Sequence, residues 1–169
     1  MSRNILVVNG HPDPRPERFC AALCEAFSAG AQAKGCATRR LDVGTLNLPA
    51  LDGIESAYRL FRAADRLAIF YPLWADAPPT ELRQLFDYVS RLTAHLDPAR
   101  TAAKVARVVV TTALPAFLYR TKQHDDAPRL SLAGVQAQEP TFIGSVESIS
   151  DDQRVRWLAE MRGYGKSCA

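Results

Sequence analysis

Short apolar runs alternate with longer amphipathic segments along most of this chain, and this alternation limits the possible folds more than any other feature. Residues 5–9, 67–71 and 105–112 are apolar runs of strand length. Between them, apolar side chains recur at the three- and four-residue spacing of helices. Strands that alternate with helices form a parallel sheet with helices on both faces, joined by right-handed crossovers. The pattern therefore predicts an α/β fold.

The remaining elements follow the same alternation. We expect further strands at 38–41 and 142–146, and helices over 19–30, 54–64 and 82–92. Pro79 lies near the first turn of the third of these helices, where proline is tolerated. Ser150 and Gln153 form a capping box that predicts a final helix. Residues 120–140 are the least regular stretch, which predicts a loop or a broken helix.

Composition excludes several classes of protein. The chain has 169 residues and a net charge of +3, with basic and acidic side chains interspersed. This predicts a single domain, residues 1–169, and no nucleic-acid partner. No run approaches the roughly 18 apolar residues of a membrane span, and no signal peptide is evident. The cysteines, which are Cys20, Cys24, Cys36 and Cys168, have neither redox nor zinc spacing, so we expect buried thiols and a cytoplasmic protein.

Ligands of open α/β sheets bind beyond the carboxyl ends of the strands, which directs attention to three loops. The first, residues 10–18, leads into a helix whose N-terminus attracts phosphate. Arg15 and Arg18 would add guanidinium donors to such a site. The alternative is that this loop, stiffened by prolines, is only a connector with solvated arginines.

The other two loops have similar alternatives. In residues 72–79, Trp74 is placed to cover a flat ring, although a core or interface aromatic is the more common explanation for such a residue. In residues 111–119, the hydroxyls of Thr111 and Thr112 could bond a ligand or could simply pack. Tyr119 and His124 could handle protons together, or could be ordinary surface residues. The histidine spacing predicts no metal site.

Several motifs resemble the flavodoxin-like NAD(P)H:quinone oxidoreductases. They are Gly10-His11-Pro12 with Arg18-Phe19, Phe70-Tyr71-Pro72-Leu73-Trp74, Leu82-Arg83 with Phe86-Asp87, and Thr111-Thr112 with Tyr119. The resemblance implies a flavodoxin-like three-layer αβα sandwich. Its parallel sheet would have five strands in the order 2-1-3-4-5.

The resemblance also implies an activity. Members of that family bind FMN or FAD and pass hydride from NAD(P)H to a quinone or similar small acceptor, usually as homodimers. By resemblance, the flavin phosphate and ribityl chain would contact His11, Arg18, Phe19 and Cys20. The isoalloxazine ring would lie along Pro72, Leu73, Trp74 and Ala75, with Thr111, Thr112 and Ala113 at its edge. Tyr119 and His124 are the implied catalytic candidates, and FMN is the expected flavin because no adenosine-binding segment is evident.

Departures from the family pattern keep two alternatives open. Arg18 and Cys20 replace the usual serine and asparagine, and Asp76 places a carboxylate near the expected flavin. Ala113 and Leu114 stand where the third loop usually has glycine, and each side chain takes space that a ring would need. One alternative is a flavodoxin-like binding or regulatory protein with impaired flavin binding. The other is a divergent enzyme that uses the same cleft for another small aromatic substrate.

Overall fold

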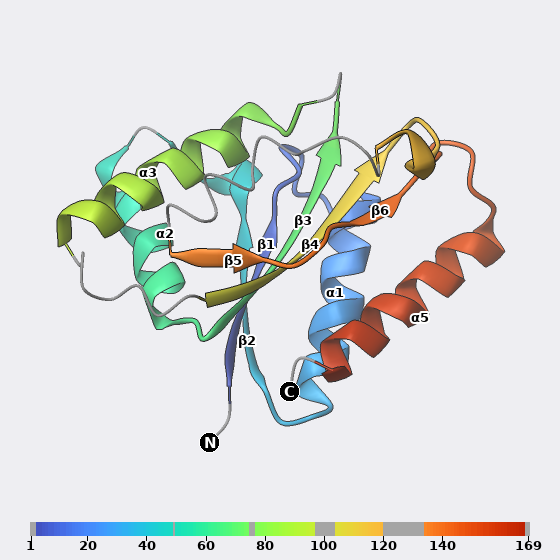
Figure 1. The fold of residues 1–169 in the computed structure, drawn as a ribbon, viewed down its shortest axis with the longest axis horizontal. Helices are drawn as coiled ribbons and strands as arrows, with labels where there is room; N and C mark the ends of the chain where they lie inside the picture. The colour runs from blue at the N-terminus through green and yellow to red at the C-terminus, as the bar shows by residue number, and fades with distance from the viewer. Residues whose placement is uncertain (1–2, 49, 75–76, 97–103, 120–133, 168–169) are drawn as a thin grey trace.

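A parallel sheet runs through the centre of the molecule, with helices on both faces (Figure 1). The computed structural model describes residues 3–48, 50–74, 77–96, 104–119 and 134–167. The strands are β1 (Asn4–Asn9), β2 (Ala37–Asp42), β3 (Arg66–Leu73), β4 (Lys104–Thr112), β5 (Val135–Ala137) and β6 (Thr141–Ile143). The helices are α1 (Phe19–Gln32), α2 (Leu51–Ala63), α3 (Thr80–Leu96) and α5 (Asp151–Ser167), with short 3-10 turns η1 (Val43–Thr45) and η2 (Ala116–Leu118). The strand order β2-β1-β3-β4-β5 confirms the predicted topology.

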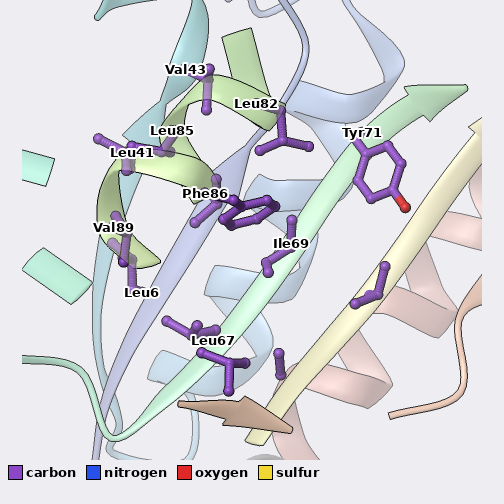
Figure 2. Close-up of a cluster of buried hydrophobic side chains, with 14 of the residues drawn as sticks. Leu6, Leu41, Val43, Leu67, Ile69, Tyr71, Leu82, Leu85, Phe86 and Val89 are labelled. Atoms are coloured by element: carbon purple, nitrogen blue, oxygen red, sulfur yellow. The ribbon is translucent and has the colours of Figure 1, made fainter. Parts of the chain in front are cut away.

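Alternation along the central strands sorts their side chains between two cores. Leu6 and Val8 of β1 pack with the apolar faces of α2 and α3, whereas Val7 packs with α1 and α5 on the opposite face. Figure 2 shows the first core, where the ring of Phe86 from α3 lies against β3 near Ile69. Both faces of the central strands are therefore buried over most of their length, which explains why these strands are mostly apolar.

Glycines allow α1 and α5 to cross very closely. A Cβ added to Gly30 of α1 would meet the carbonyl oxygen of Arg162, and one added to Gly165 of α5 would meet the carbonyl oxygen of Phe27. Side chains at either position would force the two backbones apart. The close packing of α5 on α1 thus depends on two glycines, which have no side chain.

Strand β3 continues through Pro72, two residues beyond the end predicted at Tyr71. The pairing of β1 with β3 ends at Phe70, whereas the pairing of β3 with β4 continues to Leu73. Beyond Phe70 the strand has a ladder partner on one side only. A proline, which lacks the N–H donor, is accepted there because the strand has become an edge.

The last position in the sheet is divided between two short strands. The strand expected at 142–146 is present as β6 but ends at Ile143, and β5 was not expected. Both β5 and β6 pair with β4. Val105 pairs with Gln136, a sequence separation of 31, and Val109 pairs with Thr141, a separation of 32. The segment between β5 and β6 therefore contains one residue more than the facing segment of β4. This is the count of a β-bulge. Strand β5 also lies in the stretch expected to be irregular; residues 120–133 of that stretch lie outside the described residues.

The final helix begins as predicted. The backbone N–H of Ser150 donates to Oε1 of Gln153 at 2.9 Å, and the N–H of Gln153 donates to Oγ of Ser150 at 3.3 Å. This reciprocal pair satisfies two donors that the helix itself leaves unpaired. Among the described helices, none has the length and apolar character that crossing a membrane requires.

The close crossing of α1 and α5 generates a stability prediction. Gly30→Ala places a methyl group against the backbone of Arg162, and overpacking of this kind should lower the free energy of unfolding by about 2 kcal/mol. Gly163→Ala is the matched control, because a Cβ there meets nothing within 4 Å. In that control, better helix propensity should raise the free energy by about 0.5 kcal/mol. Urea unfolding measures both; equal effects in the two variants would contradict the proposed crossing.

Candidate functional site

The order of the strands brings three loops together at one edge of the sheet. Because β3 lies between β1 and β4, the residues that follow Asn9, Leu73 and Thr112 come out side by side. Figure 1 shows the arrowheads of β3 and β4 pointing to this edge. These are the loops in which the sequence predicts a ligand. We call this region the carboxyl edge.

A buried asparagine anchors the first loop to the neighbouring strand. Asn9 is fully buried at the end of β1, and its Nδ2 donates to Oδ1 of Asp42 at 2.8 Å. Its Oδ1 accepts the backbone N–H of His11 at 3.3 Å. Asp42 is held in turn by a two-pronged hydrogen bond from Arg40. The path of the loop is therefore set by a polar network that begins inside the sheet.

His11 links the first loop to the second. Its Nδ1 accepts the backbone N–H of Asp13 at 2.9 Å, which assigns the proton of the neutral ring to Nε2. Its ring meets Trp74 edge to face, with centroids 5.4 Å apart. Burial, and then the positive charge of Arg18, lower the pKa of His11 below its ordinary value of 6.5. The imidazole is therefore neutral at pH 7 and is a donor through Nε2.

Asp13 lies between the two arginines of the first loop. Arg15 donates from Nε at 2.9 Å and from Nη2 at 2.6 Å, and Arg18 donates from Nε at 2.7 Å. Hydrogen bonds from Arg15, assisted by those from Arg18, hold the pKa of Asp13 well below its usual range. The side chains of Arg15 and Arg18 remain 66% and 45% exposed, so they are accessible to a ligand.

Helix α1 begins directly after this loop, with Arg18 as its N-cap. No side chain caps the helix, so its first backbone N–H groups lack the usual partner. Phe19 lies under the guanidinium of Arg154, 5.1 Å from the ring centroid. Cys20 is buried, and its Sγ lies 3.4 Å from Oγ1 of Thr111. Burial raises the pKa of the Cys20 thiol to about 11, so it is a packing group rather than a nucleophile.

The second loop exposes a single aromatic ring. Pro72 and Leu73 are buried within β3, and Leu73 belongs to the core under α3. Trp74 is 53% exposed, and its backbone exchanges hydrogen bonds with Ala77 at 3.0 and 2.9 Å. Among the described residues expected along a flavin ring in this loop, Trp74 is therefore the one with an available side-chain face. Ala75 and Asp76 lie outside the described residues.

The hydroxyls at the end of β4 already have partners. Thr111 and Thr112 are 4% and 2% exposed. Oγ1 of Thr111 faces Cys20, and Oγ1 of Thr112 accepts the backbone N–H of Leu114 at 3.2 Å. Ala113 is exposed just beyond them. This arrangement makes the two threonines supports of the loop, with Ala113 at its rim.

Tyr119 packs in the core. Its side chain is 4% exposed, and its ring stacks on Phe142 of β6 with centroids 6.1 Å apart. The third loop exposes three large apolar side chains, those of Leu114, Phe117 and Leu118. Gly144 lets η2 pack tightly here, because a Cβ would meet the backbone of Ala116. His124, the other predicted catalytic residue, lies outside the described residues.

Sequence reasoning placed the three loops correctly but missed how they are connected. The roles of Asn9 and Asp13 were not predicted. A signal existed for Asn9, since a polar residue that ends an apolar strand usually has a partner. For Asp13, the signal was the spacing of one carboxylate with arginines two and five residues later. Among the described residues, no cluster of His, Cys, Asp and Glu could hold a metal.

The anchor at Asn9 can be measured. We expect Asn9→Ala to lower the free energy of unfolding by about 2 kcal/mol, because it leaves the backbone N–H of His11 and the carboxylate of Asp42 without this partner. A double-mutant cycle with Asp42→Ala should show a coupling energy of about 1 kcal/mol. A coupling energy near zero in urea unfolding would contradict a direct interaction between these side chains.

His11 predicts a pH dependence of stability. Its pKa is lowered on folding, so the unfolded chain takes up the proton first as the pH falls. The contribution of His11 to stability is thus retained above a pH of about 6.5 and is lost as the pH falls below that value. Urea unfolding at pH 7.5 and 5.5 measures the loss, which should be smaller in His11→Asn. An NMR titration in which His11 protonates above pH 6.5 would refute the assignment.

Comparisons with known proteins agree with this architecture. The family model of the flavodoxin-like fold matches residues 3–162. No curated protein sequence matches the chain. Among solved structures, the NAD(P)H:quinone oxidoreductase from Methanothermobacter marburgensis has a TM-score of 0.75 and 19% identity, covering 99% of this chain and 98% of that one.

Two further structures are similar over almost the whole chain. The azoreductase from Bacillus anthracis str. Sterne has a TM-score of 0.70 and 15% identity, covering 99% of this chain and 100% of that one. An NADH:FMN oxidoreductase in its apo form has a TM-score of 0.70 and 18% identity, covering 99% and 90%. Likeness at these identities shows a shared fold. Since the family model spans nearly all of the sequence, the chain belongs to the flavodoxin-like fold family.

Proposed function

We propose that this protein is an oxidoreductase that binds FMN at the carboxyl edge and passes electrons from NAD(P)H to a small quinone-like acceptor. One observation carries the proposal: an uncapped helix N-terminus beside Arg18 and an exposed ring at Trp74 meet at the same edge, joined through His11. Phosphate suits the first and a flat aromatic ring suits the second. The names of the similar structures, a quinone oxidoreductase, an azoreductase and an NADH:FMN oxidoreductase, support this kind of chemistry.

The start of α1 would hold the flavin phosphate. Its first N–H groups have no side-chain cap and lie at the positive end of the helix dipole, where phosphate binds favourably. The exposed guanidiniums of Arg15 and Arg18 would add charge-assisted hydrogen bonds. The anchor from Asn9 to His11 would keep this loop in place, which lowers the entropy lost on binding.

The second and third loops would hold the ring. Trp74 offers an exposed aromatic face, and its edge contact with His11 restricts its orientation. Leu114 and Phe117, which are 52% and 67% exposed, would shield the ring and an apolar acceptor from water. Bound FMN would supply the hydride-transfer chemistry, and the protein would position it and exclude water.

Other residues have supporting roles in this proposal. Thr111 and Thr112 would keep Ala113 at the rim through their contacts with Cys20 and Leu114. The stacking of Tyr119 on Phe142 favours a packing role for this side chain. Proton transfer by Tyr119 or His124 stays a prediction, as does the homodimer that the family resemblance implies.

A second candidate function is a flavodoxin-like binding protein with impaired flavin affinity. It draws support from the third loop, where the hydroxyls of Thr111 and Thr112 are already engaged within the chain. The two candidates make opposite predictions about flavin uptake. They can therefore be separated by one binding measurement on the purified protein.

The test is a titration of the purified protein with FMN, followed by flavin fluorescence and absorption, and then an assay of NADH and NADPH oxidation with a water-soluble quinone. We expect flavin binding and flavin-dependent oxidation of at least one nucleotide. Trp74→Ala should raise the Kd for FMN about fivefold, since an aromatic contact contributes on the order of 1 kcal/mol. Trp157→Phe, a change in the partly buried face of α5, should leave FMN affinity within about twofold.

Two results would count against this function. A wild-type protein that takes up no FMN would favour the binding protein with impaired flavin affinity. If the protein binds FMN but oxidises neither NADH nor NADPH, the proposed reductase activity is wrong, whereas the proposed flavin-binding site is retained. An equal loss of affinity in Trp74→Ala and Trp157→Phe would show that Trp74 acts through folding, and thermal unfolding of both variants would check this.

A further inference from the structure

An internal anion occupies the arginine pair of the first loop. The carboxylate of Asp13 receives a two-pronged hydrogen bond from Arg15 and a second guanidinium from Arg18, at 2.7 Å from its Nε. Two guanidinium groups directed at one set of anionic oxygens is the geometry with which arginines bind phosphate. Asp13 therefore makes the contacts that the phosphate of a ligand would make.

The position of Asp13 is set by the loop itself. Its backbone N–H donates to Nδ1 of His11 at 2.9 Å, and its Oδ1 accepts the backbone N–H of Arg15 at 3.2 Å. Its side chain is 26% exposed, less than either arginine that it binds. The carboxylate is thus directed into the arginine pair by local backbone contacts.

Formal charges in this loop cancel. Arg15 and Arg18 contribute +2, and Asp13 and Glu17 contribute −2. Burial keeps His11 neutral at pH 7 by lowering its pKa, so it adds no positive charge. A phosphate that approaches α1 meets the helix dipole but no net positive charge from these side chains. Removal of one carboxylate would change the net charge to +1.

Both ion pairs are exposed, and this decides whether a ligand can displace Asp13. Exposed ion pairs contribute little to stability, because water and salt screen them. A phosphate at the start of α1 would bind the guanidiniums and would also accept hydrogen bonds from the first backbone N–H groups of the helix. Asp13 binds the guanidiniums but not these N–H groups of the helix. Phosphate can therefore displace the carboxylate, but it must break these interactions and tolerate a nearby like charge.

We propose that Asp13 is a specificity-determining residue whose carboxylate competes with the ligand phosphate for Arg15 and Arg18. The inference rests on the proposed function, because it takes the phosphorylated ligand to be FMN. It goes further than that function, because it predicts that Asp13 reduces the preference of this protein for FMN over riboflavin. Riboflavin has the same ring as FMN and no phosphate. Such a site discriminates between the two less strongly than its arginines would allow.

The experiment compares FMN with riboflavin in wild type and in Asp13→Asn. We expect Asp13→Asn to lower the Kd for FMN about fivefold, the size of one exposed charge interaction, in roughly 20 mM salt. The Kd for riboflavin should stay within about twofold, because the ring end is unchanged. In about 1 M salt the gain for FMN should fall below about twofold, since the Debye length shrinks to roughly 3 Å.

Matched variants separate charge from shape. Asp13→Glu keeps the negative charge, so its Kd for FMN should stay within about twofold of wild type. Glu55→Gln removes the same charge from an exposed position on α2, where the carboxylate faces Arg59, and should change neither Kd. Arg18→Gln should act in the opposite direction to Asp13→Asn and weaken FMN alone. Thermal unfolding of each variant verifies that the fold is retained.

The outcomes distinguish this inference from the function on which it rests. If wild type binds FMN and Asp13→Asn binds it equally or more weakly, Asp13 does not compete and the inference is wrong. A gain that is the same for riboflavin would also overturn it, because the effect would not involve the phosphate. If wild type and all variants bind neither flavin, the proposed function itself fails, and the inference with it.

Discussion

The parallel pairing of β1, β3 and β4 is the constraint on which the rest of the structure depends. Strands that are parallel and buried on both faces need crossover helices on both sides. Each crossover returns the chain to the amino edge, so every strand ends at the carboxyl edge. The three loops that follow Asn9, Leu73 and Thr112 meet there for this reason. The site is thus a consequence of the topology, and the loops add its chemistry.

Polar contacts then convert an edge of the sheet into a defined surface. Asn9 is fixed at the end of β1, and its side chain holds the backbone of His11 by a hydrogen bond. The ring of His11 in turn contacts the ring of Trp74. The arginine pair around Asp13 belongs to the same loop but is exposed, so it is more easily rearranged. The carboxyl edge therefore combines a fixed aromatic contact, between His11 and Trp74, with exposed ion pairs around Asp13 that a ligand can rearrange.

Much of the fold could be predicted from sequence because its signals are local. Apolar runs and helical spacing predicted the strands and helices, and Ser150 with Gln153 predicted the cap of α5. The exceptions involve tertiary contacts. Pro72 does not end β3, because β1 has already ended beside it, and β5 was missed because its few residues depend on pairing with β4. Local patterns contain no information about a missing or distant neighbour.

The candidate site divides in the same way. By itself, the sequence determined which loops lie at the carboxyl edge and which residue types they contain, because strands that alternate with helices form a parallel sheet whose strands all end at one edge. Only the tertiary structure decided that Thr111 and Thr112 support the third loop and that Tyr119 is buried against Phe142. The physical reason is that hydrogen bonds and burial depend on what lies opposite a side chain in space, and the chain order does not specify this.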